Sequence, residues 1–174
     1  MSQTDLVISR AGFPPFSARG VTQTLEPLLC GEMRRTIDGR LVYTGLSNHQ
    51  KYKSLILCED KAALAMGSLW RGAEVKVSCI ASLPQECQGQ KGDTVVLMRP
   101  AVLGSIRLYD ESHQRYEVRL EENGTVVTFT GSGDYPDKLY LTYRPLLKMR
   151  ILTFKILTDE WGGKGGWRMT LEEI

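Results

Sequence analysis

The sequence has little of the chemistry that metal sites and nucleophilic enzymes need. Its histidines and cysteines number two and four: His49, His113, Cys30, Cys58, Cys79 and Cys87. The cysteines are 28, 21 and 8 residues apart, whereas zinc ligands usually come in close Cys-x-x-Cys pairs. Cys58 and Cys79 lie within apolar runs, which is typical of buried thiols that act as small hydrophobic side chains. We therefore predict neither a metal ion nor another cofactor.

The chain also lacks a recognisable catalytic motif. Neither His49 nor His113 lies near a Gly-x-Ser-x-Gly elbow or a reactive-cysteine signature. The paired carboxylates are adjacent in sequence, so on a strand they point to opposite faces and cannot flank one glycosidic bond. Lys164 is followed by glycine rather than by the hydroxyl residue of a phosphate-binding loop. We predict that the protein is not an enzyme and has no small-molecule substrate.

No charge excess or long apolar run indicates a nucleic acid or a membrane. The chain carries 22 basic and 20 acidic residues, a formal net charge of +2, without a basic or acidic tail. The first five residues have neither the basic nor the apolar region of a secretion signal. No apolar run approaches the roughly 20 residues of a membrane span. We expect a protein made and folded in the cytosol, with no specific nucleic-acid partner and no membrane insertion.

The sequence is rich in glycine and in short apolar runs, and these predict strands. Its 17 glycines and 7 prolines fall mostly between runs of β-branched and aliphatic residues. Asp38-Gly39 and Asn123-Gly124 each separate two such runs and predict β-hairpins, the first with a type I′ turn. Leu146–Leu157 and Trp167–Glu173 predict a third hairpin that carries much of the core. We predict an all-β, antiparallel barrel or sandwich of about nine strands.

Arg34-Arg35, in the first hairpin, could belong to a basic patch. Phosphate binding usually needs a broader basic surface. We interpret the pair as a solvent-facing strand with one inward-directed side chain.

The two ends of the chain supply the candidate contact residues. Pro14-Pro15 cannot continue a central ladder, so we predict an extended N-terminal arm over residues 1–20 and a single domain over residues 21–174. Phe13 and Phe16 would anchor this arm on a neighbour, or alternatively cap the chain's own barrel. At the other end Trp161 borders the glycine-rich tip, whereas Trp167 belongs to the core. The interface candidates are Phe13, Pro14, Pro15, Phe16, Trp161, Gly162, Gly163 and Lys164.

Several strings spread along the chain carry a family resemblance. They read DLVISRAGFPPFSARG at 5–20, TQTLEP at 22–27, MRRTIDG at 33–39, KYKS at 51–54, YRPLLKMR at 143–150, TDEWG at 158–162 and GWRMTLEEI at 166–174. Together they resemble a group of small virion structural proteins of tailed bacteriophages. The resemblance implies a late, phage-encoded particle component that is assembled in the host bacterial cytoplasm.

Within that group the resemblance favours a ring-forming tail-tip or baseplate protein that docks copies of itself and neighbouring virion proteins. Ring subunits extend hairpins and arms because one heterologous interface repeats around a closed ring. A neck or short-tail adaptor and a head-decoration protein are the alternatives. A rival from another class is a carbohydrate- or receptor-binding β-module in which Trp70 or Trp161 stacks on a sugar.

Overall fold

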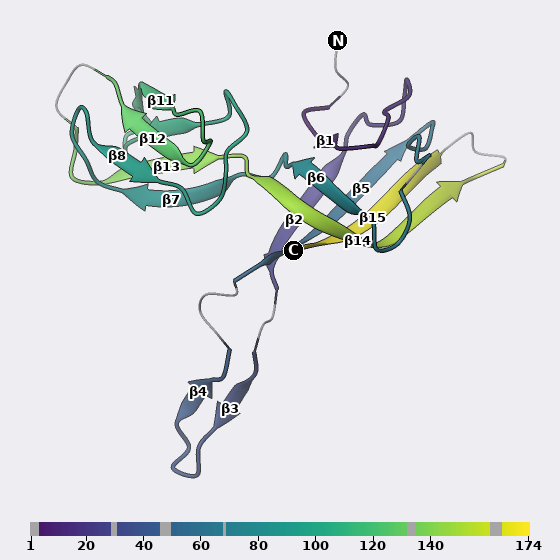
Figure 1. Cartoon of the computed structure of the whole chain (residues 1–174), viewed down its shortest axis with the longest axis horizontal. Coiled ribbons are helices and arrows are strands. Elements are labelled where there is room, and N and C mark those ends of the chain that lie inside the picture. Colours follow the sequence, from purple (N-terminus) through teal and green to yellow (C-terminus); the bar gives the residue numbers. More distant parts are fainter. Residues whose placement is uncertain (1–3, 29–30, 46–49, 68, 132–134, 161–164) are drawn as a thin grey trace.

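The computed structural model describes residues 4–28, 31–45, 50–67, 69–131, 135–160 and 165–174 (Figure 1). These residues form fifteen strands and no helix, which confirms the all-β prediction. The strands exceed the predicted nine because several segments that resemble loops in the sequence pair briefly. Examples of these short strands are Val7–Ile8, with two residues, and Leu83–Cys87, with five.

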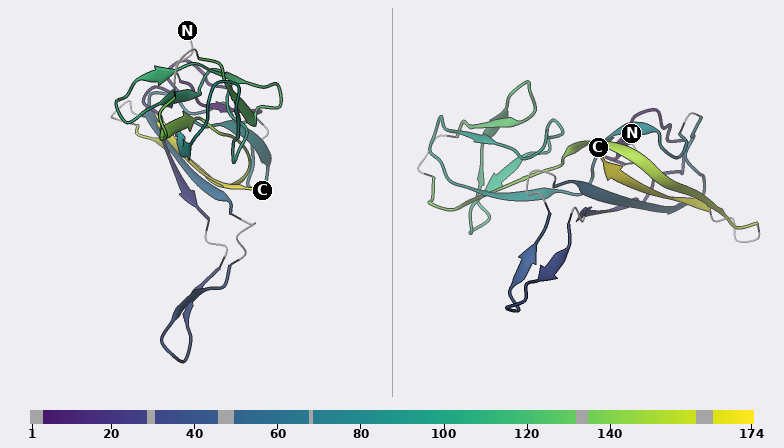
Figure 2. Two further views of the ribbon diagram at one scale, coloured as in Figure 1. Left: turned by 90° about the vertical axis from the view of Figure 1, so that its left-hand side faces the viewer. Right: turned by 60° about the horizontal axis from the view of Figure 1, so that its bottom comes forward.

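The largest sheet contains six antiparallel strands in the order β1-β6-β14-β15-β5-β2. β14 and β15, the strands of the predicted C-terminal hairpin, lie in the middle of this sheet. The sheet is strongly twisted and curls around one face (Figures 1 and 2). The bounds of its strands are β1 (Val7–Ile8), β2 (Thr22–Pro27), β5 (Tyr52–Asp60), β6 (Glu74–Ser78), β14 (Leu146–Thr158) and β15 (Gly165–Glu173).

A second part of the chain, between residues 83 and 143, forms two smaller sheets. One has the order β10-β9-β13-β7 and the other the order β11-β12-β8. The chain enters β14 directly from β13, so Arg144-Pro145 joins the two parts. The bounds are β7 (Leu83–Cys87), β8 (Thr94–Val96), β9 (Arg107–Tyr109), β10 (Arg115–Tyr116), β11 (Val118–Leu120), β12 (Val126–Phe129) and β13 (Leu139–Tyr143).

The buried hydrophobic side chains fall into two clusters, one for each part. On the six-stranded sheet, Trp167, Met169 and Leu171 alternate along β15 and are fully buried, which agrees with the period of two in the sequence. In the second part, Phe129 and Tyr143 are the largest members of a separate cluster. Each cluster therefore stabilises its own sheets.

The remaining strands, β3 (Met33–Arg35) and β4 (Leu41–Tyr43), pair only with each other and project from the six-stranded sheet (Figures 1 and 2). The predicted hairpin is present, but its turn is not type I′. Only Gly39 has a positive φ, of 81°, and its N–H bonds to the Thr36 carbonyl. The turn is the three-residue kind that needs one left-handed glycine. All residues of both strands are exposed, so the predicted inward side chain of Arg34-Arg35 is wrong.

Candidate functional site

Four predicted interface residues lie in the N-terminal segment, residues 4–20, which packs on the six-stranded sheet of its own chain. Gly12 and Ala65 form an antiparallel bridge with N–H···O distances of 3.1 and 3.0 Å. The indole Nε1–H of Trp167 donates to the buried Ser17 carbonyl over 2.7 Å. The structure thus does not confirm an arm extended away from the domain. Four side chains of this segment are almost wholly buried: Leu6, Ile8, Ser17 and Ala18.

The four candidates divide between the interior and the surface. Phe13 packs partly buried against the core of the six-stranded sheet, as the alternative interpretation expected, and Pro14 is also partly buried. Pro15 is exposed, and the Phe16 side chain is 50% exposed. Of the two phenylalanines, Phe16 therefore presents the larger apolar surface to solvent.

The exposed Phe16 is held in an unusual backbone conformation. Its φ is +64°, in the left-handed region that bulky residues rarely adopt. Its carbonyl accepts the N–H groups of Lys61 and Ala62 at 3.1 and 3.0 Å, and the Arg19 guanidinium lies 4.4 Å from its ring centroid. Such strain persists where surrounding contacts fix it and is frequent at functional positions. Phe16 thus remains a candidate contact residue.

An ion pair fixes this segment to the end of β5. The Asp60 carboxylate accepts the Arg19 backbone N–H at 3.0 Å and a guanidinium N–H at 2.8 Å. It also accepts the N–H of Lys61 at 2.8 Å. These bonds, those from the Arg19 side chain above all, hold the pKa of Asp60 well below its usual range despite partial desolvation. A charged Asp60 is therefore part of what keeps the N-terminal segment in place.

The other four candidates, Trp161, Gly162, Gly163 and Lys164, lie outside the described residues. The neighbouring glycines belong to the sheet: Gly165 and Gly166 are in β15 and pair with Asp60 and Glu59. A Cβ on Gly166 would lie 2.6 Å from the carbonyl oxygen of Cys58. At Gly166, glycine is thus required because the neighbouring strand is too close for a side chain.

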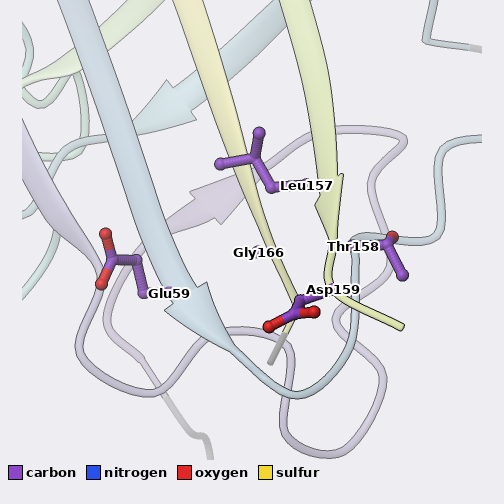
Figure 3. Close-up of a pocket in the computed structure, with 6 residues that line it drawn as sticks. Glu59, Leu157, Thr158, Asp159 and Gly166 are labelled. Atoms are coloured by element: carbon purple, nitrogen blue, oxygen red, sulfur yellow. The ribbon is translucent and has the colours of Figure 1, made fainter. Parts of the chain in front are cut away.

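A shallow pocket of about 360 Å³ lies beside these glycines (Figure 3). Its carboxylates come from Glu59 and Asp159, which lie on either side of Gly166 in the close-up. Leu157 supplies the apolar part of the wall. The pocket is an acidic depression at the end of the β14–β15 hairpin.

An exposed apolar surface that the sequence patterns do not reveal lies on the β3–β4 ribbon (residues 32–44). Met33 pairs with Tyr43 and Arg35 with Leu41, and directly opposed residues share a face of a ribbon. Met33 is 66% exposed, and Leu41 and Tyr43 are each about half exposed. One face therefore carries three uncovered apolar side chains, and Ile37 adds another at the turn. The Asp-Gly turn predicts the hairpin, but not that both of its strands are left exposed by the rest of the described residues.

A second apolar surface is the Trp70 groove, defined here by residues 66, 67, 69–71 and 152–156, with a volume of about 670 Å³. Trp70 is 79% exposed at its rim. Phe154 and Ile156 line its floor, and they face the same side of the sheet as their buried partners Met169 and Trp167. The groove is thus an opening at the edge of the core.

The described cysteines are buried, free thiols of low reactivity. Burial raises the pKa of Cys79 to about 11, and it also raises the pKa values of Cys58 and Cys87. The thiolate is the nucleophile, so these groups are poor nucleophiles near neutral pH. Their surroundings are those of small hydrophobic side chains. Cys30 lies outside the described residues.

The structure describes one of the two histidines, His113, and a largely buried carboxylate, Glu173, that forms an ion pair. His113 is exposed on a turn, 6.0 Å from the Tyr109 ring, and His49 lies outside the described residues. Glu173 accepts a 2.6 Å bond from Arg99 and a 2.9 Å bond from the Tyr52 N–H. Since Arg99 belongs to the second part of the chain, this ion pair joins the two parts. Among the described residues, no three His, Cys, Asp or Glu side chains are grouped to hold a metal ion.

Comparison with known proteins identifies no relative: no family model matches the chain, and no curated protein matches its sequence. In the described ranges, no helix has the length and hydropathy of a membrane span.

Proposed function

We propose that this chain is a structural component of a tailed-bacteriophage particle, specifically a ring-forming tail-tip or baseplate protein. It docks copies of itself and neighbouring virion proteins, and it is assembled into particles in the host bacterial cytoplasm. The role needs no catalysis, cofactor, nucleic acid or membrane. The sequence strings given above support this proposal, and so does the distribution of exposed apolar surface.

The observation that carries the proposal is the β3–β4 ribbon. An isolated two-stranded ribbon is at best marginally stable in water. This one leaves Met33, Leu41 and Tyr43 uncovered on one face. Exposed apolar patches on a projecting element are typical of surfaces that a partner covers. A subunit that completes its packing only within an assembly accounts for such a ribbon.

Further contacts are proposed at the two ends of the chain. Pro15 and Phe16 present apolar surface from a rigidly held loop. At the other end, Trp161–Lys164 remain predicted contact residues. Aromatic side chains frequently anchor interfaces. These ends would contact neighbours on either side in a ring.

Disruption of the gene in the phage that encodes the chain tests the proposal. An amber codon at Met33 should give no infectious particles on a non-suppressing host and should leave incomplete assemblies visible by negative-stain electron microscopy. Normal particles in normal yield would refute a structural role. Immunogold labelling would then distinguish the tail tip from the neck and from the head surface.

A carbohydrate-binding module is the second candidate, because Trp70 is exposed at the rim of a groove as sugar-stacking aromatics are. This function predicts binding to host surface glycans by the purified protein. Trp70→Ala should then abolish glycan binding while the oligomeric state is unchanged. Loss of assembly without any glycan binding would favour the structural role.

A further inference from the structure

The distal half of β14 has a free edge. On its inner side, β14 pairs with β15 as far as Thr158, opposite Gly165. On its outer side, β6 pairs only with Leu146–Arg150, and the Ile151 N–H and C=O bond to Ala73 and Gly72. Beyond that point, no strand among the described residues pairs with the outer edge of residues 153–158. Unpaired strand edges are templates for the addition of another strand.

The Trp70 groove lies directly beside this free edge. Phe154 and Ile156 project into it from β14, and Ile156 is 55% exposed. A strand added to the edge would therefore place one row of its side chains in the groove, because side chains alternate between the faces of a sheet. An apolar row there would continue the core of the six-stranded sheet.

The β3–β4 ribbon has the complementary features. Both of its outer edges are free among the described residues, since β3 and β4 form a sheet of two strands. One face carries Met33, Leu41 and Tyr43 together with Arg35, and the other face carries Arg34 and Val42. Added to the β14 edge, the ribbon would turn its apolar face into the groove.

The two surfaces point in different directions and do not meet within the molecule. The ribbon projects from the roots of β2 and β5, away from the far end of β14 and β15 (Figures 1 and 2). We therefore propose that the β3–β4 ribbon of one copy adds to the free edge of β14 in a second copy and fills its Trp70 groove. The contact is heterologous, so each copy gives a ribbon to one neighbour and receives one from another. This proposal rests on the ring-forming function proposed above and specifies its interface.

Mixing two variants tests the contact. Leu41→Asp places a charge on the apolar face of the ribbon, and Ile156→Asp places one in the groove; both side chains are exposed in the single chain, so the fold is retained. The mass of each protein is measured by analytical ultracentrifugation, from micromolar to millimolar concentration. The wild-type chain should form oligomers, and each variant alone should remain a monomer of 19.5 kDa. An equimolar mixture should give a dimer of 39 kDa, twice 19.5, because one intact ribbon meets one intact groove.

Met98→Asp is the matched control. Met98 is 70% exposed, like the substituted residues, but it lies in the second part of the chain. This variant should assemble as the wild-type chain does. Amide hydrogen exchange gives an independent measurement. Within residues 153–158, the amides that point to the outer edge, away from β15, should become protected in the wild-type oligomer and stay unprotected in Leu41→Asp.

Three results would overturn the proposed contact: a wild-type chain that stays monomeric, single variants that still assemble, or a mixture that gives no dimer. None of them depends on whether the protein is found in particles. The interface and the virion function can thus fail separately. Met33→Asp repeats the ribbon test at a second position, should Leu41→Asp disturb the ribbon itself.

Discussion

Replacing Trp167 by phenylalanine tests whether the N-terminal segment belongs to the core. The indole N–H of Trp167, on β15, donates to the carbonyl of Ser17 over 2.7 Å, and both residues are fully buried. Phenylalanine keeps most of the apolar ring but cannot donate this hydrogen bond. The only other donor near that carbonyl is the weak Cys58 thiol, at 3.4 Å, among the described residues. The substitution therefore leaves a buried carbonyl without a strong partner.

The cost of that loss is about 1–3 kcal/mol for an unsatisfied buried acceptor. The smaller ring adds a contribution of the same sign, because it leaves unfilled volume in a close-packed core. With an m value of about 2 kcal/mol/M for urea, the unfolding midpoint should fall by about 0.5–1.5 M. Far-UV circular dichroism follows the transition without depending on tryptophan emission. Trp70→Phe, at an exposed position, is the control and should change stability by less than about 0.5 kcal/mol.

A Trp167→Phe midpoint within error of the wild-type midpoint would refute the reasoning. The Ser17 carbonyl would then have no need of the indole, and the N-terminal segment would not be packed on the sheet as described. Amide exchange of residues 4–20 would be fast in that case. Such a result would support the extended N-terminal arm that the sequence predicts.

Four further predictions follow from the same contacts. Deletion of residues 1–20 removes the buried Leu6, Ile8 and Ala18, so the truncated chain should unfold at lower urea or fail to fold; a stable truncated domain would instead support the arm. Ile151→Asp should unfold the domain, because Ile151 is fully buried and an uncompensated charge there costs several kcal/mol. Leu152→Asp, at the bulge, should destabilise the domain less. Equal effects of the two variants in urea melts would contradict the register of β14. The folded-state pKa of Asp60 is depressed, so its stabilising effect is present above its unfolded pKa of about 3.9 and is lost as the pH falls below that value. Asp60→Asn should therefore lower the melting temperature at pH 7. A difference in melting temperature between Asp60→Asn and wild type that did not shrink toward pH 2 would argue against the Arg19 contact. In a Cys30→Ser background, the thiols of Cys58, Cys79 and Cys87 should react with Ellman's reagent at pH 8 only after unfolding, and rapid labelling of the native protein would contradict their burial.

Local turn and strand chemistry is what the sequence predicts well. The β14–β15 hairpin follows from an apolar run, a glycine-rich connection and an alternating run, and Trp167 opens the buried face of β15 as the alternation indicates. The Asp38-Gly39 hairpin follows from its turn residues. Its turn type is less predictable, since a type I′ turn and a type I turn with a bulge both use a left-handed glycine.

Tertiary packing is what the sequence leaves undetermined. Pro14-Pro15 excludes a central strand, but an irregular segment can equally extend into solvent or cover a sheet, and here Leu6 and Ile8 give it enough buried surface to cover one. The uncovered state of Met33, Leu41 and Tyr43 is likewise invisible in the sequence, where an alternating apolar pattern resembles that of any half-buried strand. The bulge at Leu152 also changes which side of β14 faces the core. The groove therefore depends on a local irregularity that the pattern does not contain.

The central claim, that this chain is a subunit of a phage particle, is tested most directly by quantitative mass spectrometry of purified particles. The number of copies is measured against the major capsid protein, before and after particles are washed in high salt. The proposal predicts that the chain remains in the particles in one fixed, small multiple of copies, as a closed ring requires. A chain that is abundant in the lysate but absent from washed particles would contradict it.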